Sequence, residues 1–136
     1  MPAVFLFGAG ASYGSDVSPR TPPLGAALFP ALQAFNPPGW GALPPEIGRA
    51  FQHDFERAFE GVPGHTLPPL QRAMAAYFFQ FAPGPNSLYL ALAHRLRARP
   101  GWQGAFCTLN YERLLELSII GRRRAPFHRH ATSART

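Results

Sequence analysis

Lysine is absent from this chain of 136 residues, and cysteine occurs only once, as Cys107. A single cysteine excludes an internal disulfide and a zinc site built from cysteines. The absence of lysine excludes the mononucleotide P-loop, whose Gly-Lys-Ser/Thr sequence needs a lysine to reach the phosphates. No apolar run approaches the ~18 residues of a membrane helix, and no basic-then-apolar leader is visible. We therefore expect a cytoplasmic protein with no membrane partner.

The positive charge of the chain is concentrated at one end. All 13 Lys or Arg positions are arginine, and residues 1–120 hold eight of them with all seven acids, a net charge of +1 (8 − 7). Residues 121–136 hold the other five arginines, no acid and no periodic pattern, so we expect a disordered basic tail. A nucleic-acid surface would spread its cations over a folded face, so this distribution argues against nucleic acid as a partner. A tail that contacts nucleic acid or an acidic protein remains an alternative function.

Sixteen prolines and thirteen glycines divide the remaining sequence into short segments. Two apolar runs, residues 3–7 and 104–109, predict strands, and the first is typical of a strand that is buried on both faces of a parallel sheet. Apolar spacing predicts helices over residues 26–35, 46–59, 69–81, 87–99 and 111–120. The alternation of strand, helices, strand and helix predicts an α/β fold with a Rossmann-like parallel sheet. Two strands make only part of such a sheet, so we expect an incomplete domain.

A glycine-rich segment, residues 8–14, follows the first predicted strand directly. Glycine after a buried strand permits a tight turn, and a second glycine at Gly10 lets a phosphate approach the main chain because no side chain intervenes. Backbone N–H groups in such a turn, with a helix start beyond it, bind anions. A purely structural turn explains the same pair of glycines, so the loop alone does not decide between the two.

Two other motifs fit this loop less well. The dehydrogenase fingerprint needs a third glycine one residue earlier than Gly14, and it needs an acid about twenty residues later, where residues 26–35 contain none. Residues 10–14 also match the Gly-x-Ser-x-Gly elbow of serine hydrolases, with Ser12 as the nucleophile. Those enzymes place strands ahead of the elbow, and too few residues precede Ser12 to form them.

Three segments together resemble the sirtuin-like NAD-consuming domains: residues 5–12 (FLFGAGAS), 21–25 (TPPLG) and 107–116 (CTLNYERLLE). The resemblance covers roughly residues 3–120. Within the family, the sequence is most similar to the bacterial branch that hydrolyses NAD in antiviral defence. It implies only the N-terminal half of such a domain, because the later strands have no counterpart here. A shifted reading frame or a truncated gene would produce this, and another chain that completes the domain is an implied partner.

The resemblance also implies roles for individual residues. The family's Gly-Ala-Gly-x-Ser loop contacts the diphosphate and adjoining ribose of NAD, and a Gly/Pro-rich stretch covers the nicotinamide side. The asparagine after the second strand lies beside the nicotinamide ribose and is catalytic, which makes Asn110 the implied catalytic residue. No metal is implied, and the ligand is NAD or ADP-ribose. The residues implied to contact it are Gly8, Ala9, Gly10, Ala11, Ser12, Thr21, Pro22, Asn110 and Tyr111.

A neutral amide at Asn110 suits cleavage of a glycosidic bond. Such cleavage passes through an oxocarbenium-like transition state. An amide orients water or holds a ribose hydroxyl without offering a competing nucleophile. From the residues alone, Asn110 has a second reading as the N-cap of the helix predicted at 111–120, because asparagine is a strong helix cap.

The base that the family uses, a histidine followed by glycine, has no counterpart in this sequence. Histidine suits general-base work near neutral pH because its ordinary pKa is about 6.5. His53, His65 and His94 lie in helical or loop stretches and are most simply solvated or packed. His128 and His130 follow Asn110 and are the alternative candidates for the base, although they lie in the arginine-rich tail. The resemblance implies an NAD hydrolase, whereas the missing histidine favours the alternative, a non-catalytic module that binds NAD or ADP-ribose, or an inactive fragment.

Overall fold

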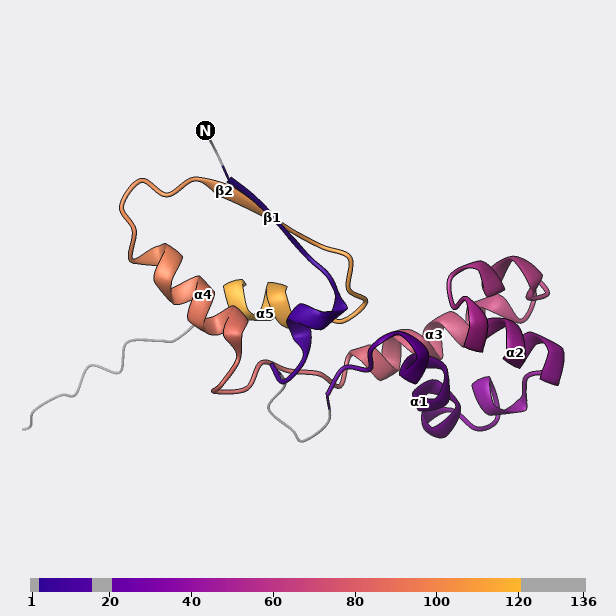
Figure 1. Cartoon of the computed structure of the whole chain (residues 1–136). Helices are drawn as coiled ribbons and strands as arrows, with labels where there is room; N and C mark the ends of the chain where they lie inside the picture. The colour runs from indigo at the N-terminus through magenta and orange to yellow at the C-terminus, as the bar shows by residue number, and fades with distance from the viewer. Residues whose placement is uncertain (1–2, 16–20, 121–136) are drawn as a thin grey trace, which may run out of the picture.

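The computed structural model describes residues 3–15 and 21–120. Helices and strands in this part of the chain are mixed, which confirms the α/β class (Figure 1). None of the described helices is long and apolar enough to cross a membrane. The predicted basic tail lies outside the described residues. In chain order the elements are β1 (Ala3–Phe7), η1 (Ala9–Ser12), η2 (Gly25–Ala27), α1 (Leu28–Phe35), η3 (Trp40–Ala42), α2 (Pro45–His53), η4 (Arg57–Gly61), α3 (Leu67–Phe78), α4 (Leu88–Arg97), β2 (Gly104–Thr108) and α5 (Leu114–Ile120), where η marks a 3₁₀ helix.

Both predicted strands are confirmed, and they pair with each other in parallel. The register runs from Ala3 opposite Gly104 to Phe7 opposite Thr108. The ladder continues one residue further, where the N–H of Leu109 donates to the carbonyl of Phe7 at 3.0 Å. Because the strands are parallel, their carboxyl ends meet at the same edge of the sheet. The segments that follow β1 and β2 therefore lie side by side.

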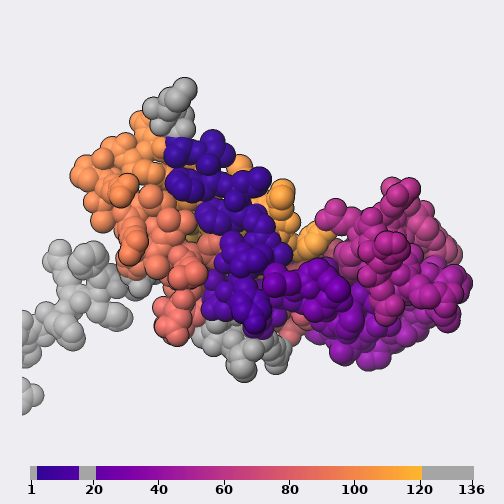
Figure 2. All heavy atoms as spheres, viewed as in Figure 1, coloured from indigo at the N-terminus to yellow at the C-terminus, as the bar shows by residue number. Residues whose placement is uncertain are grey.

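Only one face of this two-stranded sheet is covered by the described residues, so the expectation of burial on both faces is wrong there. On the covered face, the Phe7 ring meets the Tyr89 ring of α4 edge-on at 5.5 Å. On the other face, Val4 is 70% exposed and Leu6 is 65% exposed. Figure 2 shows β1 as an indigo band at the surface of the molecule. Apolar side chains on both faces of a strand are typical of a sheet that is covered on both faces, and the described residues cover these two strands on one.

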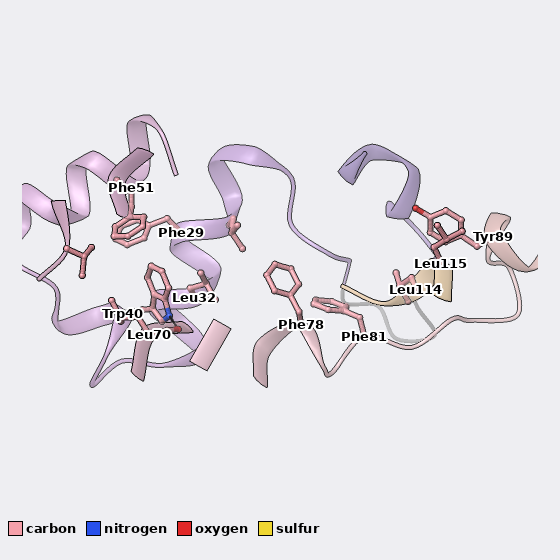
Figure 3. Close-up of a cluster of buried hydrophobic side chains, with 13 residues drawn as sticks. Phe29, Leu32, Trp40, Phe51, Leu70, Phe78, Phe81, Tyr89, Leu114 and Leu115 are labelled. Carbon is pink, nitrogen blue, oxygen red and sulfur yellow. Dashed lines mark hydrogen bonds between the residues drawn. The ribbon is translucent and has the colours of Figure 1, made fainter. Parts of the chain in front are cut away.

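The helices α1, α2 and α3 pack around Trp40, which is fully buried (Figure 3). Its indole Nε1–H donates to the carbonyl of Leu70 at 3.1 Å, so the one polar atom of the side chain is satisfied. The Phe51 ring lies edge-on to the indole at 5.1 Å, and the Phe29 ring at 6.3 Å. These contacts form the helical end of one hydrophobic cluster, which continues through Phe78 and Phe81 to the residues beneath the sheet.

The single helix predicted over residues 46–59 is wrong, because the chain breaks at Asp54. The helix α2 ends at His53, and η4 begins only at Arg57. The carboxylate of Asp54 accepts the N–H of Arg57 at 3.1 Å. Aspartate competes in this way for backbone donors that a continuous helix would use. The apolar spacing was correct for packing, since the Phe55 ring still stacks on Trp40 at 5.8 Å.

Two leucines in helices provide a matched test of this core. Leu32 in α1 is fully buried, whereas Leu88 in α4 is 70% exposed. We expect Leu32→Ala to lower the free energy of unfolding by about 2–5 kcal/mol, because it removes buried methyl groups and leaves a cavity. Leu88→Ala should change it by no more than about 0.5 kcal/mol. Urea unfolding followed by circular dichroism measures both, and equal losses would contradict the packing described above.

Candidate functional site

A cavity of about 370 Å³ lies at the carboxyl ends of β1 and β2, against α2 and the end of α3. All three segments that carry the sequence resemblance contribute to its lining. The cavity is thus built from residues that are far apart in the sequence and that the parallel strand pair brings together. Its lining consists of Ala9, Pro22, Pro23, Gly25, Ala26, Leu28, Phe51, Gln52, His53, Phe55, Glu56, Phe78, Leu109, Asn110, Tyr111 and Glu112.

The predicted site residues divide into two groups in the structure. Ala9, Pro22, Asn110 and Tyr111 line the cavity. The other predicted residues lie next to it without lining it: Gly8 and Gly10 are exposed, Ala11 and Thr21 are half-buried, and Ser12 is buried. The structure therefore brings the predicted segments to one place, but only part of each segment faces the cavity.

The glycine loop forms a tight 3₁₀ turn immediately after β1. The N–H of Ala11 donates to the carbonyl of Gly8 at 2.9 Å, and Gly14 closes the turn with a φ of 72°, in the left-handed region that favours glycine. A Cβ atom added at Gly8 or Gly10 would meet no atom within 4 Å. The main chain of the loop thus presents an open surface that a bulky anionic group is able to approach.

Ser12 is the centre of a buried hydrogen-bond network that connects this loop to the segment after β2. Its hydroxyl donates to a carboxylate oxygen of Glu112 and accepts from the amide Nδ2 of Asn110 at 2.8 Å. The hydroxyl of Tyr89 lies 2.9 Å from the same Ser12 oxygen. Because Ser12 has only one hydrogen, which it gives to Glu112, Tyr89 is the donor in this last bond.

The network is kept away from solvent, which fixes the protonation of Tyr89. Tyr89 is 3% exposed and Glu112 is 4% exposed. Burial is the largest effect and raises the pKa of the Tyr89 phenol; the hydrogen bond with Ser12 opposes it, the charge of Glu112 adds to it, and the net pKa is raised. The phenol therefore stays neutral and remains a donor at physiological pH.

Asn110 is held by its nitrogen atoms and is free at its side-chain oxygen. Its backbone N–H donates to the hydroxyl of Thr108 at 3.0 Å, and its Nδ2 bonds Ser12. Its Oδ1 is buried and has no hydrogen-bond partner among the described residues. The helix α5 begins only at Leu114, so the reading of Asn110 as the N-cap of that helix is wrong. The side chain instead binds a loop 98 residues away in sequence.

Tyr111 connects the end of β2 to the helical core across the cavity. Its hydroxyl donates to the carboxylate of Glu56 at 3.2 Å, and its ring lies 5.5 Å from that of Phe78. Burial raises the pKa of the Tyr111 phenol, and the charge of Glu56 together with the hydrogen bond it accepts raises it further. A cavity wall is therefore formed jointly by the segment after β2 and the segment between α2 and η4.

The arrangement around Ser12 does not suit a serine nucleophile. Within the described residues, its hydroxyl is bonded to Tyr89, Glu112 and Asn110, and no histidine bonds it. The side chain is also fully buried. Of the histidines considered in the sequence, His53 lines the cavity, whereas His128 and His130 lie outside the described residues.

Sequence reasoning missed Tyr89, Glu112 and Glu56. Glu112 carried a signal, since it follows Asn110 and Tyr111 in the motif that the resemblance singles out. Tyr89 and Glu56 carried none, because their contacts with the site are made over long sequence separations. Comparison with protein-family models, with curated proteins and with solved structures finds no match for this chain.

The first test of the site concerns the pair Ser12 and Glu112. We expect Ser12→Ala to lower the free energy of unfolding by about 1–3 kcal/mol, because it leaves the buried Glu112 carboxylate without its donor. Adding Glu112→Gln should recover part of that loss. A double-mutant cycle by urea unfolding should give a coupling energy of at least about 0.5 kcal/mol, and additive effects would mean that the two side chains do not interact.

The second test concerns the pKa of Tyr111. Glu56→Gln removes the negative charge but not the burial, so the Tyr111 pKa should fall while remaining above its ordinary value of 10.0. Absorbance titration of the phenolate near 295 nm measures the shift, with Tyr111→Phe identifying the Tyr111 signal. Glu60→Gln is the control, because Glu60 is another exposed glutamate that does not line the cavity. An equal shift in both variants would contradict the Tyr111–Glu56 contact.

Proposed function

We propose that this chain is the NAD-binding part of a sirtuin-like domain with a Rossmann-like sheet, and that it hydrolyses the bond between nicotinamide and ribose. The observation that carries this proposal is the position of the cavity. It lies at the carboxyl ends of two adjacent parallel strands and is lined from all three resembling segments. Ligands of open α/β sheets bind at this edge. A volume of about 370 Å³ suits one end of a dinucleotide.

The glycine loop supports the binding half of the proposal. Gly8 and Gly10 are exposed beside the cavity, with open space where a Cβ would stand. The diphosphate would approach the main chain of this loop, and the nicotinamide riboside end would enter the cavity past Ala9. The resemblance implies that Ser12 contacts the diphosphate, but in the structure Ser12 is buried and points into the hydrogen-bond network. In this proposal Ser12 positions Asn110.

Asn110 supports the catalytic half. Its Nδ2 is fixed by Ser12, so the amide cannot rotate freely, and its Oδ1 still lacks a donor. An oxygen acceptor held in one orientation is able to take a hydrogen bond from a ribose hydroxyl or from the attacking water. In the hydrolysis, the water oxygen bonds to the ribose C1′, the glycosidic C–N bond breaks, and nicotinamide leaves with the bonding electron pair while a proton is released.

A non-catalytic module that binds NAD or ADP-ribose is the second candidate. It is favoured because no histidine among the described residues hydrogen-bonds to the Ser12 network. His53 lines the cavity but bonds none of these groups. The two candidates share the same binding surface and differ only in turnover.

The deciding experiment incubates the purified full chain with NAD and measures nicotinamide release by chromatography, with affinity measured by calorimetry. We expect release in the parent chain. In Asn110→Ala, release should fall by at least about a hundredfold while binding persists, since a positioned polar group is lost. Binding without release in the parent chain would establish the non-catalytic module. If the parent chain neither binds NAD nor releases nicotinamide, both candidates are overturned.

A matched glycine pair tests the loop itself. Gly10→Ala fits the fold because nothing lies within 4 Å of the added Cβ, and Gly61→Ala in η4 is equally open. The methyl group at Gly10 would stand where the diphosphate approaches, so NAD affinity should fall about tenfold, or ~1.4 kcal/mol. Gly61→Ala should leave affinity unchanged. Equal affinity in the two variants would remove the diphosphate from this loop.

A further inference from the structure

The charged side chains that line the cavity are acidic. Glu56 and Glu112 both contribute to the lining, together with the imidazole of His53. Among the described residues no arginine lines it, although the chain has 13 arginines in all. A pocket that took the diphosphate itself would be expected to show guanidinium groups, which recognise phosphate in pairs of hydrogen bonds. The acidic side chains of the lining instead suit a part of the ligand that carries positive charge.

Aromatic rings make up much of the remaining wall. Phe51 and Phe55 come from the helical core, Phe78 comes from the end of α3, and Tyr111 comes from the segment after β2. The faces of such rings carry partial negative charge and attract cations placed over them. Aromatic rings and a carboxylate that line the same cavity therefore both attract a positively charged ligand ring.

We propose that this cavity selects a cationic pyridinium ring over its neutral counterpart, and that Glu56 is the residue that sets this preference. The inference rests on the proposed function and deepens it, because the nicotinamide of oxidised NAD is a pyridinium cation whereas that of the reduced form is uncharged. Glu56, held by the Tyr111 hydroxyl at 3.2 Å, is a specificity-determining residue contributed by the chain between α2 and η4.

Glu56 rather than Glu112 carries the selection because the two carboxylates differ in access. Glu112 is buried and accepts the hydroxyl of Ser12. Glu56 is exposed and lines the cavity, and its hydrogen-bond donor among the described residues is the neutral Tyr111 hydroxyl. No arginine of the described residues lines the cavity, so no guanidinium among them offsets the negative charge there. The same geometry assists release of the product, since nicotinamide leaves the ribose as a neutral molecule and loses the attraction.

The test uses two small probes that differ at the ring nitrogen, where one carries a methyl group and a positive charge and the other carries neither. The cation 1-methylnicotinamide and neutral nicotinamide have the same ring and carboxamide. Their affinities for the full chain are measured by NMR titration at low salt. We expect the cation to bind about tenfold more tightly, and we expect the preference to shrink at high salt because the carboxylate is exposed.

Variants assign the preference to a residue. Glu56→Gln should reduce the preference for the cation to about threefold or less, the part that the rings supply, whereas Glu60→Gln should leave it unchanged. Tyr111→Phe keeps the ring and removes the hydroxyl, which tests the hydrogen bond separately. The melting temperature of each variant shows that it is folded.

The outcomes separate this inference from the proposed function. Equal binding of the two probes, no binding of either, or an unchanged preference in Glu56→Gln would overturn the inference. A Glu56-dependent preference in a chain that does not bind NAD would support the cation site and overturn the dinucleotide proposal. NAD binding with no preference between the probes would leave the proposed function standing and refute the role of Glu56.

Discussion

Five residues of β1 lie against five residues of β2, and this short parallel ladder brings the two halves of the described chain together. It sets Phe7 opposite Thr108, so the residues that come next on each strand leave the sheet side by side. The bond between Ser12 and Asn110 follows from that register. A slip of one residue would turn every side chain of β2 to the opposite face and separate the two loops. The site therefore depends on the pairing more than on either loop alone.

The site also depends on the aromatic residues packed around Trp40, which belong to the helices and not to the sheet. By breaking at Asp54, the chain after α2 directs Phe55 back to Trp40 and leaves Glu56 beside Tyr111. The Phe78 ring at the end of α3 lies 5.5 Å from the Tyr111 ring. The cavity is thus lined both by the strand ends and by the helices, and one continuous hydrophobic cluster supports both sets of residues.

The sequence was sufficient for features that are encoded locally. Apolar runs predicted both strands, and the glycines with Asn110 predicted where the chain turns at the sheet edge. It was not sufficient for Tyr89, whose helix gives no sign that its hydroxyl meets Ser12, a contact over 77 residues. It also failed at Asp54, where a side-chain bond ends a helix that the spacing continues. Burial of both sheet faces failed because it depends on neighbouring strands rather than on residues 3–7.

Among the described residues, the side-chain oxygens of Ser15, Ser87 and Asn110 are buried without a hydrogen-bond partner, and of these three residues only Asn110 lines the cavity. A buried acceptor that lacks a donor costs about 1–3 kcal/mol. Here the nitrogen bonds Ser12 and Oδ1 has no partner in the described part of the chain. Ser12, Tyr89 and Glu112 are all buried, so the amide is fixed from behind by groups that do not reorganise with solvent. A costly acceptor that is held rigidly beside a cavity is explained if a ligand hydroxyl or a water supplies the donor. That requirement links the local energetics of one amide to the reaction proposed for the whole site.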